Sequence, residues 1–66
     1  MESAPFPAAA VVRARRQLLG IGLETLAAEA GLSVELLQAL ERGDFDPRSL
    51  HQKAKAVLEQ RLDITL

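Results

Sequence analysis

Residues 23–43 read LETLAAEAGLSVELLQALERG, and this stretch decides the fold. Two apolar stripes with helical spacing run through it: Leu26, Ala27 and Ala30 in the first half, Leu37 and Leu40 in the second. This spacing predicts one helix over residues 23–30 and another over residues 34–42. Gly31 is suited to end the first helix with a positive φ, and the Ser33 side chain can cap the second. The stretch therefore predicts two short helices joined by a tight turn.

The spacing favours a helix-turn-helix over a generic helical hairpin, because two helices that cross steeply constrain particular positions. A small residue is needed in the middle of the first helix, where the second lies close. A glycine is needed four residues later, and apolar residues must follow at the turn and on the inner side of the second helix. The residues that meet these requirements, in order, are Ala27, Gly31, Leu32, Leu37 and Leu40.

Helices are also predicted on both sides of this centre. Residues 8–19 have apolar residues on one face: Ala8, Val11, Val12, Leu18 and Leu19. Asp46 followed by Pro47 is typical of a helix start, which predicts a fourth helix running to about Leu62. Its apolar stripe consists of Leu50, Ala54, Val57, Leu58 and Leu62.

The chain of 66 residues is long enough for one small domain, and its apolar content is mostly leucine and alanine, which favour helix. We expect an all-α, four-helix domain over residues 8–62 with the helix-turn-helix at its centre. Residues 1–7 contain two prolines and are expected to form a flexible arm. Residues 63–66 are expected to form a short apolar tail that packs on a neighbouring chain.

The composition argues against several classes of function. There is no cysteine and one histidine, so no thiolate metal site is available, and the sequence contains no phosphate-binding loop. We therefore expect no enzyme activity, no cofactor and no metal. No segment is long and apolar enough to span a bilayer, which favours a cytoplasmic protein. The net charge of −1 lacks the basic excess that is usual in nucleic-acid-binding proteins.

Residues 23–33 resemble the helix-turn of the λ-repressor-like (XRE-type) family, and residues 37–43 are similar to the end of that family's recognition helix. The resemblance covers about residues 12–58. It implies a transcription regulator that binds double-stranded DNA. It also implies a pair between Arg16 on the first helix and Glu41 at the end of the third, which occupy matching positions.

Several positions depart from the pattern of family members that read DNA. Leu23 stands where glutamine is usual, and Val34, Glu35 and Ala39 stand where polar contact residues are usual. Residues 33–46 are instead similar to the helix-turn-helix domain of the bacterial rod-shape protein RodZ. In that family the domain contacts a cytoskeletal protein rather than operator DNA.

Two hypotheses for the function follow. In the first, the chain is a DNA-binding regulator whose contacts to bases or phosphates come from Ser33, Glu35, Gln38, Arg42 and Arg48, with further possible phosphate contacts from Arg13, Arg15, Lys53 and Lys55. In the second, it is a protein-interaction adaptor with an apolar patch formed by Leu23, Val34 and Leu36. In either case we expect a homodimer formed through the fourth helix and the tail.

Overall fold

The computed structural model describes residues 8–66, and within them the chain folds into four α-helices and one short 3-10 turn without a β-strand. The bounds in chain order are α1 Ala8–Leu18, α2 Leu23–Ala30, α3 Val34–Arg42, η1 Pro47–Ser49 and α4 Gln52–Leu62. The predicted all-α class is confirmed, and so are the bounds predicted for α2 and α3. The flexible arm predicted for residues 1–7 lies outside the described residues.

The turn between α2 and α3 has the geometry expected from its residues. Gly31 has a φ of 70°, and its N–H donates to the carbonyl of Ala28 at 3.2 Å. The N–H of Leu32 donates to the carbonyl of Ala27 at 2.8 Å, so the last turn of α2 closes in the Schellman manner. The Ser33 hydroxyl oxygen then accepts the N–H of Leu36 at 3.0 Å and caps α3.

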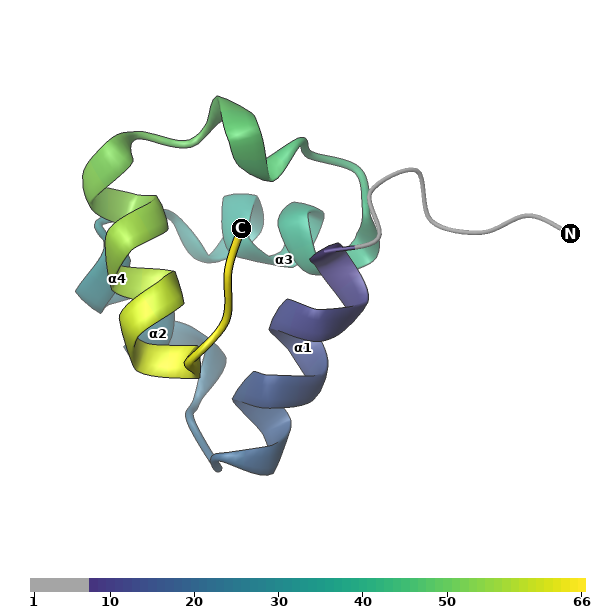
Figure 1. Cartoon of the computed structure of the whole chain (residues 1–66), viewed down its shortest axis with the longest axis vertical. Coiled ribbons are helices and arrows are strands. Elements are labelled where there is room, and N and C mark those ends of the chain that lie inside the picture. Colours follow the sequence, from purple (N-terminus) through teal and green to yellow (C-terminus); the bar gives the residue numbers. More distant parts are fainter. Residues whose placement is uncertain (1–7) are drawn as a thin grey trace, which may run out of the picture.

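The core lies where the four helices meet. α3 packs against α1 and α2, and α4 packs against the same two helices, as can be followed in Figure 1. The largest fully buried side chains come from every helix: Val12, Leu26, Leu37, Leu40, Leu58 and Leu62. Burying a side chain of this size stabilises the fold by about 1.5–3 kcal/mol relative to leaving it exposed.

The prediction for the inner face of α1 was partly wrong. Val12 is buried as expected, but the side chain of Leu18 is 73% exposed, and Val11 and Leu19 are each 46% exposed. α1 instead turns Ala9, Val12 and Arg16 toward its neighbours. An arginine occupies the inner line of the helix because it meets a carboxylate of α3, so apolar spacing alone misplaces the buried face.

The fourth helix begins later than predicted. Asp46 does cap a turn, with its carboxylate accepting the N–H of Arg48 at 2.9 Å, but Pro47–Ser49 forms a 3-10 turn and not the start of α4. Leu50 is extended, with φ −73° and ψ 154°, and its side chain is buried. α4 starts at Gln52, because the extended backbone lets the Leu50 side chain reach the core.

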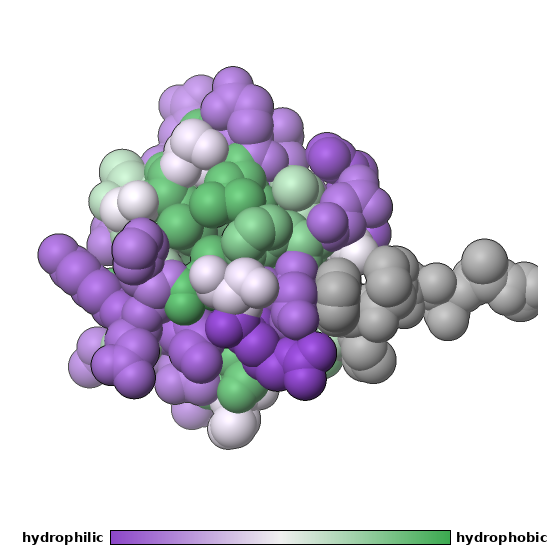
Figure 2. Space-filling view, turned by 90° about the horizontal axis from the view of Figure 1, so that it is seen from above, coloured by the Kyte–Doolittle hydropathy of each residue, from purple (hydrophilic) through white to green (hydrophobic). Residues whose placement is uncertain are grey.

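The connection between α3 and α4 closes one end of the core, at the top of Figure 1. Pro47 and Leu50 are buried there, and Phe45 is half-buried. Figure 2 views this end of the molecule face-on and shows apolar surface at its centre within a rim of hydrophilic side chains.

The C-terminal tail folds back on its own domain. Ile64 and Leu66 are half-buried against the core of their own domain, although the tail was predicted to pack on a neighbouring chain. Glu59 holds the tail at two points: its carbonyl accepts the N–H of Ile64 at 3.1 Å, and its carboxylate accepts the N–H of Leu66 at 2.8 Å. In Figure 1 the tail runs from the end of α4 toward the end of the molecule that carries the α3–α4 connection.

Among residues 8–66, no helix has the length and apolar character required to cross a membrane.

Candidate nucleic-acid interface

The outer face of α3 carries three of the five residues proposed to contact DNA. Glu35, Gln38 and Arg42 are exposed, and their spacing of three and four residues places them on one side of the helix. Ser33 is exposed at the N-terminal cap of the same helix, and its hydroxyl oxygen is engaged with the backbone. The scaffold therefore presents one line of polar side chains, all from Ser33 and α3.

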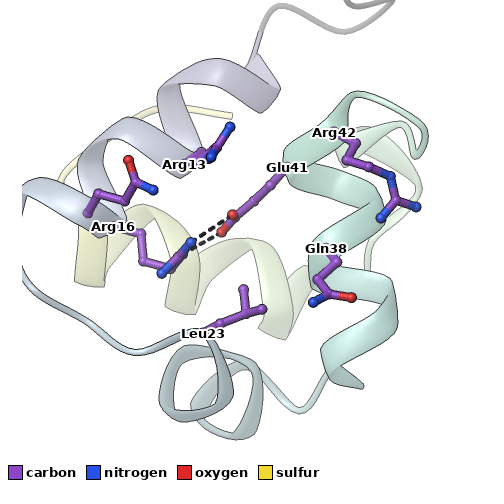
Figure 3. Close-up of a pocket in the computed structure, with 7 residues that line it drawn as sticks. Arg13, Arg16, Leu23, Gln38, Glu41 and Arg42 are labelled. Carbon is purple, nitrogen blue, oxygen red and sulfur yellow. Dashed lines mark hydrogen bonds and ion pairs between the residues drawn. The ribbon is translucent and has the colours of Figure 1, made fainter.

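A groove runs beside this face, between α3 and α1. Its volume is about 400 Å³, and it is lined by Arg13, Arg16, Gln17, Leu23, Gln38, Glu41 and Arg42. Figure 3 shows Arg13 on α1 and Gln38 and Arg42 on α3, with Leu23 at the start of α2. Most of the rim consists of guanidinium and amide groups, which are hydrogen-bond donors to anionic or carbonyl oxygens.

The floor of the groove is an ion pair that joins the two helices. The Nε of Arg16 donates to Oε2 of Glu41 at 2.6 Å, and Nη2 donates to Oε1 at 3.0 Å, so the pair is bidentate (Figure 3). The side chains are 14% and 7% exposed. The Glu41 carboxylate raises the pKa of Arg16 above its ordinary value, chiefly through this hydrogen bonding.

Arg16 also donates from Nη1 to the carbonyl of Ile21 at 3.1 Å. One guanidinium thus connects the end of α3 with α1 and with the loop that leads into α2. The two residues that the family resemblance places together are therefore paired, and they act by holding the groove in shape.

The two arginines proposed as phosphate contacts each have a nearby acidic partner. The Nε of Arg42 lies 3.0 Å from Oδ2 of Asp44, and both side chains are about 60% exposed. Arg48 donates to both carboxylate oxygens of Asp46, at 3.1 and 3.0 Å. The side-chain hydrogen bonds between them lower the pKa of Asp46 and raise the pKa of Arg48. Both cations are partly neutralised by their own loop.

Within residues 8–66, no hydrogen bond or ion pair joins Arg48 to the α3 face. It lies in η1, and its hydrogen bonds go to Asp46. Four of the five proposed contact residues thus belong to α3 and its cap, and the fifth belongs to the connection that follows.

Acidic and basic residues are segregated along the chain. Residues 23–46 contain six acidic residues and one arginine, whereas residues 8–22 and 47–58 contain no acidic residue at all. The cations of these two segments are Arg13, Arg15, Arg16, Arg48, Lys53 and Lys55. The segment formed by α2, α3 and the loop after them is therefore the most acidic part of the described residues.

The apolar patch proposed in the adaptor hypothesis is only partly exposed. Leu23, Val34 and Leu36 are all half-buried and pack against the core. Leu23 and Val34 are the first residues of α2 and α3, and Leu36 lies in the first turn of α3. Their side chains therefore lie beside the buried residues of these helices and cover the edge of the core. Among the described residues, the large apolar side chains that are exposed lie on α1 and directly after it.

Gln17 lines the groove but is not among the residues predicted from the sequence to contact DNA. The sequence contains two indications of this position. Gln17 directly follows Arg16, whose pairing with Glu41 turns that side of α1 toward α3, and Gln17 lies one helical turn after Arg13. Residues 8–66 contain no group of three or more histidine, cysteine, aspartate or glutamate side chains placed to hold a metal ion.

Comparison of the chain with protein-family models, with curated protein sequences and with solved structures finds no match.

Proposed function

We infer that this chain is a small helix-turn-helix domain that binds double-stranded DNA and regulates transcription. The observation that carries the proposal is the polarity of the helix-turn-helix surface. α3 exposes Glu35, Gln38 and Arg42, while its leucines are buried or half-buried. A polar, hydrogen-bonding ridge on a capped helix suits the edges of bases in a major groove better than an apolar pocket of another protein. This role would place the protein in the cytoplasm.

The exposed side chains divide into two roles. Gln38 can donate to and accept from base edges, and Glu35 can accept from the exocyclic amine of cytosine. Arg13 and Gln17 can donate to phosphates from the α1 side of the groove. Arg42 can exchange Asp44 for a phosphate at little cost, because an exposed ion pair is worth about 0–1 kcal/mol.

The test is a titration of random-sequence duplex DNA at about 50 mM and about 200 mM salt, since each neutralised phosphate releases counterions. We expect weak binding that falls steeply with salt. Arg13→Ala and Arg42→Ala should each reduce the salt slope by about one unit and weaken all sequences alike. Arg61→Ala is the matched control, because Arg61 is exposed on α4 and pairs with Glu29 away from the groove.

Glu35→Gln provides a test of opposite sign. It removes a negative charge from the exposed face of α3 and should strengthen binding to duplex DNA. An unchanged affinity in Glu35→Gln, or an Arg61→Ala variant as defective as Arg42→Ala, would mean that DNA does not meet this face.

A second candidate, the protein-interaction adaptor, is favoured by the six acidic residues and one arginine of residues 23–46. In that case the partner would be a protein with a basic surface, and Glu24 and Glu35 would contact it. A folded chain that fails to bind duplex DNA at the lower salt concentration would select this function over the first.

A further inference from the structure

An apolar stripe runs along the outer side of α1. Val11, Ala14 and Leu18 are spaced by three and four residues, so they form one line on the helix. Val11 is 46% exposed and Leu18 is 73% exposed, and no other helix within residues 8–66 exposes a large apolar side chain to this extent. A single exposed leucine needs no explanation, but a line of apolar residues along one helix is the pattern of a helix-binding surface.

The two large side chains of the stripe, Val11 and Leu18, lie outside the groove described above. Arg13 and Gln17 line the groove beside α3, and Ala14 lies next to them in a second hollow, whereas Val11 and Leu18 line neither and lie on the other flank of α1. Arg15 lies on that flank as well, one helical turn from both, and its Nε donates to the carbonyl of Leu62 at 2.9 Å. Val11 and Leu18 would therefore remain accessible to a partner when a ligand occupies the groove, whereas Arg13 borders both surfaces.

The charges around the stripe have one sign. α1 contains three arginines and no acidic residue, and the next acidic residue along the chain is Glu24. Arg16 is neutralised by Glu41, but Arg13 and Arg15 form no ion pair with any residue in 8–66. An apolar line flanked by unneutralised arginines is complementary to a helix with an apolar face and acidic flanks.

We propose that the stripe formed by Val11, Ala14 and Leu18 docks an amphipathic helix of a partner protein whose flanking residues are glutamate or aspartate. A second copy docking the same stripe would bring two helices that carry arginines and no acids into contact, which like-charge repulsion disfavours. The inference does not depend on DNA binding, because Val11, Ala14 and Leu18 are not among the proposed DNA contacts and Arg13 is the one residue that both proposals use.

The probes are two designed helical peptides of about 16 residues, long enough to hold helical structure with favourable residues. Both carry leucines at helical spacing, and they differ only in having glutamates or lysines beside the leucines. Backbone amide NMR of the isotope-labelled chain maps where each peptide binds. We expect the glutamate peptide to shift the signals of Val11, Ala14 and Leu18 and to bind at least about tenfold more tightly than the lysine peptide.

Leu18→Gln should weaken binding of the glutamate peptide by at least about tenfold, because it removes the most exposed apolar side chain of the stripe. Ala56→Gln, at an exposed site on α4, is the matched control and should leave binding unchanged. Equal binding of the two peptides, or signal shifts confined to other helices, would overturn the proposal. Concentration-dependent shifts of the stripe without peptide would assign it to a second copy and would also overturn it.

Discussion

Gly31 shows how a single residue fixes the crossing of α2 and α3. Its φ of 70° lies in the left-handed region, where a residue with a Cβ atom is strained. A Cβ added at this position would meet no atom within 4 Å. Any cost of a substitution here therefore comes from the backbone conformation and not from a steric clash.

We expect Gly31→Val to destabilise the fold by more than about 2 kcal/mol, because a β-branched residue resists the left-handed conformation. Ala28→Val is the matched control: it introduces the same side chain at an exposed helical site and should cost about 0.5 kcal/mol. Gly31→Asn should fall between them, since asparagine tolerates positive φ. Urea denaturation measures all three, and equal stability of the two valine variants would contradict this account of the turn.

Asp46 gives a prediction for acid stability. Hydrogen bonds from the side chain and the N–H of Arg48 lower its pKa in the folded state below the value of about 3.9 for an unfolded aspartate. Because the folded pKa is depressed, the stabilisation is complete above the unfolded value and is lost as the pH falls through the folded one.

Arg48→Gln should raise the pKa of Asp46 toward its ordinary value, measured by NMR titration of the carboxyl carbon. The shift should be incomplete, because the N–H of residue 48 still donates to the carboxylate. Arg42→Gln removes the neighbouring exposed arginine and should leave the pKa of Asp46 unchanged. A pKa of Asp46 that responds equally to both variants would show that general charge, and not this pair, sets it.

At the scale of the helices, the segments fixed by local signals could be predicted from sequence, and those fixed by tertiary contacts could not. α2 and α3 begin and end at glycine and serine caps, so their bounds agree with the prediction. α4 begins late because the buried Leu50 side chain requires an extended backbone. The inner face of α1 was misplaced because a buried ion pair takes the place of an apolar contact.

The same limit applies to the candidate site. The outer line of α3 follows directly from the helical period, so Glu35, Gln38 and Arg42 could be placed together in advance. The pairing of Arg42 with Asp44 and of Arg48 with Asp46 could not be predicted, because it depends on the turn that each loop adopts.

The ion pair between Arg16 and Glu41 should be the polar contact that matters most for stability. We expect Glu41→Ala to destabilise the fold by about 2–4 kcal/mol, between the values for exposed and fully buried pairs, because it leaves a largely buried guanidinium without a partner. Asp44→Ala breaks an exposed pair and should change the free energy of unfolding by less than about 1 kcal/mol. Chemical denaturation compares the two, and similar effects would show that the pair does not clamp α1 to α3.

At the scale of the whole molecule, the predicted homodimer involves the end that Figure 2 shows. Apolar surface lies at the centre of that face, and the tail runs toward it in Figure 1. Ile64 and Leu66 already pack on their own core while remaining half-exposed. The homodimer stays a prediction. We expect the tail to stabilise its own domain and also to contact the second copy.

Deleting residues 64–66 separates these two contributions. In the intact chain we expect the thermal midpoint to rise with protein concentration, because a dimer that forms from the native state stabilises it by mass action. The truncated chain should melt at a lower temperature, since it loses the apolar contacts of Ile64 and Leu66 and the hydrogen bonds to Glu59. Its midpoint should also lose the dependence on concentration. Glu59→Gln is the control that weakens the anchor of the tail while keeping its apolar side chains, so it should lower the midpoint slightly and retain the concentration dependence. If the midpoint of the intact chain does not change with concentration, the tail serves its own domain alone and the dimer does not form through this end of the molecule.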